Sequence, residues 1–162
     1  MIGSRHREKI LIICTNNSSR SQMAEGYFKH AYGKYYDVYS AGIEPTAVNP
    51  YSVKVMRELG IDISNHRSKS LKEFEGQEFD HVITVCGGAK EACPFFPGGK
   101  NYMHQGFKDP ACVKGTEEEK IKIFGKVRDE IIIWIDETFK NHRFLMPETK
   151  SRRHSKSEFN QL

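Results

Sequence analysis

No apolar run in this chain approaches the roughly 20 residues that a helix needs to cross a bilayer. Apolar residues fall in short blocks, and the polar, basic start leads into an apolar stretch of only four residues, Ile10 to Ile13. That stretch is too short for the apolar region of a secretory signal peptide. The sequence therefore predicts a cytoplasmic protein that makes no membrane contact.

Cysteine is scarce, with 4 among 162 residues, and no two of them form a Cys-x-x-Cys pair. The disulfide frameworks of secreted domains and closed zinc sites normally use more, or more closely spaced, cysteines. In a cytosolic chain, catalysis is then the role that we expect for such cysteines, and we expect no bound metal ion. The places of Cys14, Cys86, Cys93 and Cys112 then decide what each thiol does.

The part of the chain between its two ends also lacks a net positive charge. Of the net charge of +4, residues 1–9 contribute +2 and residues 141–162 contribute +3, which leaves −1 for the part between them. We therefore expect no binding of nucleic acid. Pro147 and the polar residues after it predict one α/β domain at 1–144 and a basic, disordered tail at 145–162.

Apolar blocks of strand length alternate with stretches of helical spacing. We expect strands at 9–14, 36–42, 79–86 and 101–105, and helices at 20–32, 50–60 and 117–140. This order is typical of a small, doubly wound, three-layer α/β domain with a four-stranded parallel sheet. The first strand is apolar along its length, which predicts burial on both of its faces.

The strongest functional signal is Cys14-Thr-Asn-Asn-Ser-Ser-Arg20-Ser21, between an expected strand and an expected helix. Backbone N–H groups of such a loop can point inward, and they add to the positive end of the helix. Arg20 can donate two N–H groups to an oxyanion, and the same field stabilises a Cys14 thiolate. Ser21 can donate a hydrogen bond to that sulfur. The expected anion-binding residues are Thr15, Asn16, Asn17, Ser18, Ser19, Arg20 and Ser21. The alternative is a buried structural cysteine beside a helix cap.

Two further thiols follow the third expected strand. Cys86 lies at its carboxyl end, the edge of the sheet where Cys14 also lies and where open α/β sheets place active sites. Cys93 follows after a gap of six residues that begins with two glycines. The pair can form a redox relay with Cys14, bind a metal with Cys14 and His104, or be incidental.

Several segments resemble the low-molecular-weight tyrosine phosphatase superfamily, and more closely its thioredoxin-coupled arsenate reductases. They are Cys14 to Gly26, Val38-Tyr-Ser-Ala-Gly-Ile43, Gly60-Ile-Asp-Ile-Ser-Asn-His66 and Asp109-Pro110, within a resemblance over about residues 9–140. Asn16 stands where the family usually has glycine, and asparagine tolerates a positive φ. Ser19 stands where many members have a cysteine, and we expect its side chain only to start the helix.

The resemblance implies a mechanism. The Cys14 thiolate attacks arsenate, and Asp109 protonates the departing hydroxyl, although an Asp-Pro pair is also a common turn. Cys86 then displaces arsenite from Cys14, and Cys93 takes over the disulfide with Cys86. Thioredoxin or a similar dithiol protein reduces that disulfide. The resemblance therefore implies no bound cofactor, an external reductant, and phosphate or sulfate as analogues of arsenate; we expect a monomer.

A phosphatase is the alternative enzyme, because it needs only the nucleophile, the arginine and the acid. Such phosphatases typically carry tyrosines after Asp-Pro, but this chain has Ala111-Cys112-Val113. That difference points to a small inorganic oxyanion, and Cys112 is interpreted as an incidental thiol. A thiol redox sensor or an oxyanion-binding regulator is the non-enzymatic alternative.

Some arsenate reductases of the family bind potassium beside the loop, and Asn17, Glu25 and Ser40 match three of the ligands. Lys69 occupies the fourth place, where those proteins have an aspartate. An ammonium has the charge of potassium and can donate to the same oxygens. We therefore expect Lys69 to take the place of the ion, the alternative being an exposed, solvated lysine.

Overall fold

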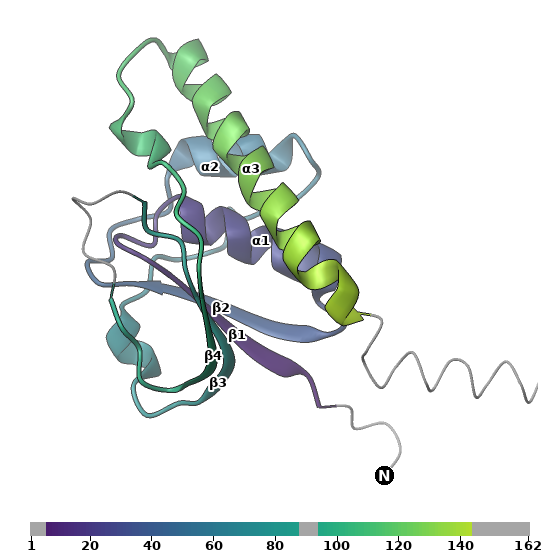
Figure 1. Cartoon of the computed structure of the whole chain (residues 1–162). Helices are drawn as coiled ribbons and strands as arrows, with labels where there is room; N and C mark the ends of the chain where they lie inside the picture. Colours follow the sequence, from purple (N-terminus) through teal and green to yellow (C-terminus); the bar gives the residue numbers. More distant parts are fainter. Residues whose placement is uncertain (1–5, 88–93, 144–162) are drawn as a thin grey trace, which may run out of the picture.

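The chain folds around a parallel sheet of four strands in the order β2-β1-β3-β4 (Figure 1). The computed structural model describes residues 6–87 and 94–143, with side chains described up to residue 140. The strands are β1 (Glu8–Cys14), β2 (Tyr36–Gly42), β3 (Phe79–Thr84) and β4 (Gly99–His104). The helices are α1 (Arg20–Tyr32), α2 (Pro50–Arg57) and α3 (Glu117–Arg143), with two short 3₁₀ helices, η1 (Leu71–Phe74) and η2 (Pro110–Cys112). The expected four-stranded parallel α/β fold is confirmed.

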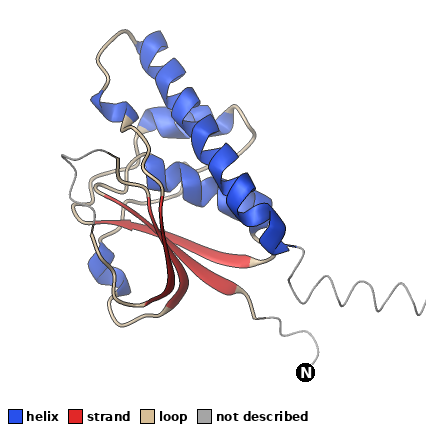
Figure 2. Ribbon diagram, viewed as in Figure 1, coloured by secondary structure: helices blue, strands red, loops and turns tan. Residues whose placement is uncertain are grey.

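The two faces of the sheet are covered unequally (Figure 2). The helices α1, α2 and α3 gather on one face, where α3 packs on both α1 and α2. On the other face, the described residues contribute η1 and the segment 94–98, which brings Phe96 into a smaller apolar cluster. The third layer expected from the sequence is therefore thin in the described part of the chain.

Strand β1 lies at the centre of the molecule. Its side chains alternate between the two cores: Ile10, Ile12 and Cys14 join the helix side, whereas Leu11 and Ile13 join the other side. All five are 2% exposed or less, which confirms burial on both faces. The loop that follows β1 is thus attached to the most firmly buried element of the fold.

Some element boundaries differ from the expected ones. The third strand ends at Thr84, the fourth begins at Gly99, and α2 ends at Arg57 before a turn in which Gly60 has φ +76°. Neither 3₁₀ helix was expected, because three- and four-residue turns leave no periodic apolar pattern. The proposed boundary at residues 144 and 145 lies outside the described residues. No helix in the described part is long and apolar enough to cross a membrane.

Candidate active site

Cys14 is the last residue of β1, and its side chain is 2% exposed. Its Sγ lies 2.9 Å from the Ser21 Oγ, in the first turn of α1. The Ser21 oxygen already accepts a hydrogen bond of 2.7 Å from the Asn17 Nδ2. The single hydroxyl hydrogen of Ser21 is therefore available to donate to a Cys14 thiolate, as the sequence predicted.

Asn17 holds the loop in shape. It is the non-glycine residue with positive φ in the described part of the chain, at +50°, so the expectation that Asn16 would need such a φ is wrong. Its Nδ2 donates to both Ser21 and Ser40, and its Oδ1 accepts from Gln22 and from the backbone N–H of Lys69. Every hydrogen-bonding position of this amide is therefore used.

Gly42, at the end of β2, packs against the backbone of the anion loop. A Cβ atom at this position would lie 2.7 Å from the Thr15 carbonyl oxygen and 2.8 Å from the Asn17 backbone nitrogen. Both contacts are with backbone, which cannot move aside as a flexible side chain can. The loop can rest on β2 only because residue 42 is glycine.

Arg20 and Asp109 meet at the loop. Arg20 is the first residue of α1 and is 3% exposed, and its Nη1 donates to the Phe107 carbonyl oxygen at 3.2 Å. Its Nη2 lies 3.5 Å from the Asp109 Oδ2. The other Asp109 oxygen accepts from the Ala111 backbone N–H at the start of η2. Asp109 therefore starts a turn and also reaches the arginine of the anion loop.

Cys86 lies two residues beyond the end of β3. The backbone N–H of Val85 donates to the Ile13 carbonyl oxygen at 2.9 Å, so the chain still runs beside β1 at this point. Cys86 is 3% exposed and belongs to the same buried cluster as Cys14. The two cysteines thus leave neighbouring strands at one edge of the sheet, as expected. Cys93 lies outside the described residues.

The fourth cysteine lies closer to the site than the sequence indicated. Cys112 is exposed, and its Sγ is 3.6 Å from the Asp109 Oδ2. Because Asp109 also contacts Arg20, this thiol stands beside the expected acid. The spacing of three residues across an Asp-Pro turn was the signal that could have placed it there.

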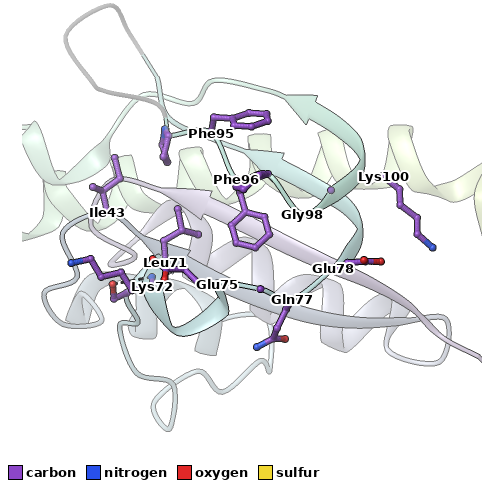
Figure 3. A pocket seen from close by; sticks show the side chains of 15 residues that line it. Ile43, Leu71, Lys72, Glu75, Gln77, Glu78, Phe95, Phe96, Gly98 and Lys100 are labelled. Carbon is purple, nitrogen blue, oxygen red and sulfur yellow. Dashed lines mark hydrogen bonds between the residues drawn. The ribbon is translucent and has the colours of Figure 1, made fainter.

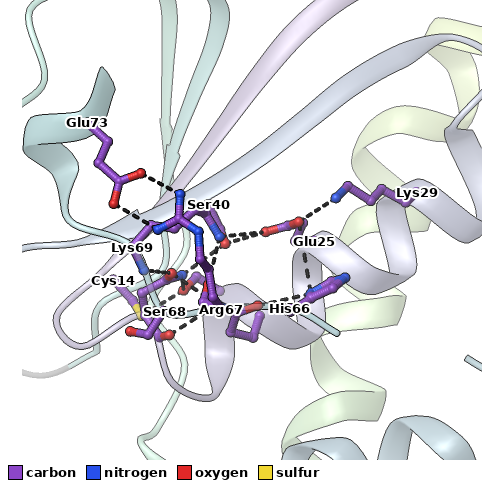
Figure 4. Close-up of polar contacts among 12 residues, drawn as sticks. Cys14, Glu25, Lys29, Ser40, His66, Arg67, Ser68, Lys69 and Glu73 are labelled. Carbon is purple, nitrogen blue, oxygen red and sulfur yellow. Dashed lines mark hydrogen bonds and ion pairs between the residues drawn. The ribbon is translucent and has the colours of Figure 1, made fainter. Parts of the chain in front are cut away.

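Behind the loop lies a buried carboxylate, Glu25 of α1 (Figure 4). The Ser40 hydroxyl and the Lys29 ammonium bind it, and the Lys69 Nζ lies 3.6 Å from its Oε1. Burial alone would raise the pKa of Glu25, but Lys69, Lys29 and Ser40 together hold that pKa below its ordinary value. This carboxylate is therefore ionised and neutralised by lysine.

Lys69 is not a solvated surface lysine, and that alternative is wrong. Its side chain is 14% exposed, and its ammonium donates to the Arg67 carbonyl oxygen at 2.9 Å. Burial lowers the pKa of Lys69, which Glu25 partly offsets. An ammonium next to the carboxylate leaves a set of residues that does not fit a potassium ion. Within the ranges 6–87 and 94–143, no cluster of three or more His, Cys, Asp and Glu side chains could hold a metal ion.

One large pocket lies away from the loop, on the second face of the sheet (Figure 3). It measures about 750 Å³, and apolar side chains of Ile43, Leu71, Phe95 and Phe96 line much of it. Phe95 is 73% exposed and stacks on Tyr102 of β4. This pocket could not be predicted from the sequence, because its walls come from three separate stretches of the chain.

Comparison with known proteins agrees with this geometry. Residues 9–141 match the family described as low molecular weight phosphotyrosine protein phosphatase, and the chain belongs to that family. Within it, the curated relatives at about half identity are arsenate reductases. That of Halalkalibacterium halodurans is 50% identical over 126 residues, which are 78% of this chain and 91% of the relative. That of Bacillus subtilis strain 168 is 50% identical over 122 residues, 75% of this chain and 88% of the relative.

Solved structures of the same fold include members with each of these two descriptions. An arsenate reductase in the phosphate binding state has a TM-score of 0.67 at 27% identity, covering 83% of this chain and 98% of that one. A low molecular weight protein tyrosine phosphatase from T. tengcongensis has a TM-score of 0.62 at 26% identity, with coverage of 83% and 99%. The fold therefore serves both activities, and the choice between them depends on the site.

Proposed function

We propose that this chain is an arsenate reductase that transfers two electrons from its own cysteines to arsenate. The observation that carries the proposal is the place of Cys86, a second buried cysteine that leaves the strand next to the one that ends at Cys14. A phosphatase of this fold needs no second thiol, whereas a reductase must supply two electrons. The arsenate reductases among its relatives support the same choice.

The first steps use the anion loop. Arsenate is held by the backbone N–H groups of residues 15–21 and by Arg20, and the Cys14 thiolate attacks arsenic. Asp109 gives its proton to the departing hydroxyl, which leaves as water. The contact between Asp109 and Arg20 supports this role, because both groups then reach the same bound anion.

Reduction follows when Cys86 attacks the sulfur of Cys14. A sulfur–sulfur bond forms, the arsenic–sulfur bond breaks, and its electron pair stays on arsenic, which leaves as arsenite. The two thiols lose two electrons in total, and arsenic(V) gains them to become arsenic(III). The product on the protein is a Cys14–Cys86 disulfide.

Recovery of the enzyme needs a third thiol and a reductant. Cys93 attacks Cys86, which forms a Cys86–Cys93 disulfide and releases Cys14 as a thiolate. Thioredoxin or a similar dithiol protein then reduces this disulfide, without a bound cofactor. Because such a cycle requires reduced thiols, we also propose that the protein works in the cytoplasm. We propose separately that it works as a monomer.

The choice of arsenate over phosphotyrosine follows from the residues after Asp109. Ala111 and Cys112 lie in η2, where aromatic side chains would be needed to stack on a phenyl ring. Phosphate and sulfate are expected to bind the loop as analogues. A low residual phosphatase activity is consistent with the same nucleophile.

The test is arsenate-dependent oxidation of NADPH in the presence of thioredoxin reductase and thioredoxin. We expect turnover that requires all three proteins and arsenate, with p-nitrophenyl phosphate hydrolysed far more slowly. Fast hydrolysis without arsenate-dependent NADPH oxidation would instead identify a phosphatase. A Cys14 that does not react with iodoacetamide near neutral pH would favour a binding protein over either enzyme.

A further inference from the structure

Ser19 lies inside the anion loop, directly before the first residue of α1, and is 4% exposed. A serine at this place usually caps the helix by accepting a hydrogen bond from a backbone N–H in the first turn. Here the side chain makes no such bond, and the backbone angles of φ −124° and ψ −75° lie outside the extended region. The interpretation of Ser19 as a helix cap is therefore wrong.

The Ser19 hydroxyl is buried and has no hydrogen-bond partner among the residues that the structure describes. Buried hydroxyls are nearly always hydrogen-bonded, because an unpartnered one forfeits the bonds that it makes with water in the unfolded chain. The nearby hydroxyl of Ser21 is occupied by Cys14 and Asn17. The Ser19 hydroxyl is therefore a buried polar group of the loop that lacks a partner in the described part of the chain.

The chemistry of the anion loop indicates which kind of partner the Ser19 hydroxyl needs. The loop presents donors, since its backbone N–H groups and the Arg20 guanidinium have hydrogens to give. The Ser19 hydroxyl has a hydrogen to give and no acceptor for it in the described part of the chain, and a tetrahedral oxyanion brings several acceptor oxygens into the loop. Resting on the proposed function, we propose that the Ser19 hydroxyl donates a hydrogen bond to the bound oxyanion.

This role goes beyond the backbone contact that every residue of the loop can make. The hydroxyl adds affinity for an oxygen-rich anion and leaves the charge of the site unchanged. A thiol at the same place is a weaker donor, so Ser19→Cys keeps the shape of the side chain and loses most of the bond. Ser19 is then a substrate-contacting residue, and its identity sets the strength of anion binding.

The experiment measures phosphate binding by calorimetry for the unmodified protein, Ser19→Ala, Ser19→Cys and Ser52→Ala. Ser52 is the matched control, because its hydroxyl is also buried without a partner in the described part of the chain, but in α2. We expect Ser19→Ala to raise the Kd for phosphate about tenfold. Ser19→Cys should raise it by less, and Ser52→Ala should leave it unchanged.

A second measurement separates a ligand contact from a structural role. Without phosphate, the melting temperature of Ser19→Ala should not fall, since the substitution removes a hydroxyl with no partner. An unchanged Kd in Ser19→Ala overturns the proposal, whether or not the melting temperature falls. If the unmodified protein itself fails to bind phosphate, the anion site of the proposed function is wrong and this role falls with it.

Discussion

At the scale of single residues, we expect the three cysteines of the proposed relay to have separable tasks. Cys86→Ser should stop reduction before arsenite is released, because no thiol then attacks the sulfur of Cys14. Cys93→Ser should release one equivalent of arsenite and stop with a Cys14–Cys86 disulfide. Single-turnover arsenite release and mass spectrometry of trypsin fragments measure both results.

The matched control for these cysteine variants is Cys112→Ser, a thiol-to-hydroxyl change outside the proposed relay. It should keep multiple turnover with thioredoxin. A Cys93→Ser variant that cycled as well as the control would show that the relay does not pass through Cys93. Cys14→Ser should release no arsenite at all, since no thiolate remains to attack arsenic.

Lys69 carries the second prediction at this scale. Its ammonium already neutralises Glu25, so exchange of potassium for sodium at constant ionic strength should leave turnover unchanged. Lys69→Asp removes the internal cation, adds a carboxylate beside Glu25, and should make turnover depend on potassium. The measurement is the rate of arsenate reduction across a potassium titration.

Lys72→Asp makes the same change of charge on the exposed side chain of η1 and serves as the control. It should respond to potassium no more than the unmodified protein does. Marked activation of the unmodified protein by potassium, but not by sodium, would disprove the role given to Lys69.

At the scale of elements, the contact between β2 and the anion loop is the critical one. Gly42→Ala would place a methyl group against the backbone of Thr15 and Asn17. Forcing a methyl group into such a tight contact costs about 1–3 kcal/mol and should displace the loop. We expect a lower melting temperature and a loss of phosphate binding, measured on the same sample.

Gly125→Ala is the control for that variant. In α3 its new methyl group would meet only the end of the flexible Arg128 side chain, at 3.8 Å, and alanine favours a helix. It should raise stability by about 0.5–1 kcal/mol and leave phosphate binding intact. Equal losses in the two variants would mean that the Gly42 contact has no special effect on the loop.

Most elements could be predicted from the sequence because their patterns are local. Three elements show this: β1 has a continuous apolar run, α2 begins at Asn49-Pro50, and α3 has a periodic apolar face. Asn49 indeed caps α2, because its side chain accepts a hydrogen bond from the Tyr51 N–H. The ends of β3 and β4 were less predictable. They depend on where neighbouring strands stop pairing, which is a tertiary property.

The features of the candidate site also differ in how far the sequence could predict them. Cys14, Arg20, Cys86 and Asp109 could be placed at one edge of the sheet from spacing, resemblance and the rule for parallel strands. The positive φ of Asn17 and the unpartnered hydroxyl of Ser19 could not. The conformation of Asn17 depends on contacts with Gly42 and the backbone of Lys69, which are distant in the sequence. Whether the Ser19 hydroxyl finds a partner depends on the folded surroundings in the same way.

At the scale of the whole molecule, Phe139 is the last core residue in the part of the chain that the structure describes. It is fully buried and packs against Phe28 and Tyr36 on the helix side of the sheet, so the described helix side of the core is well filled without residues 145–162. Removal of residues 145–162 should therefore leave the melting temperature and arsenate reduction nearly unchanged. Thermal denaturation and the coupled NADPH assay measure this.

Phe139→Ala in the full-length chain is the comparison for the truncation. Loss of a buried phenylalanine costs about 3–5 kcal/mol, so this variant should be far less stable than the shortened protein. A truncated protein that unfolds as readily as Phe139→Ala would place part of residues 145–162 in the core.

The hydrogen bonds from Glu25 to Cys14 also limit how the nucleophile can lose its hydrogen. Ser40 connects Glu25 to the Asn17 amide, and Ser21 connects that amide to the sulfur. An amide nitrogen gives hydrogen bonds but is no base, so Asn17 interrupts any proton wire toward the buried carboxylate. The Glu25 carboxylate therefore cannot take a proton from Cys14 along this chain of hydrogen bonds, and its negative charge acts on the loop only through the orientation of Asn17.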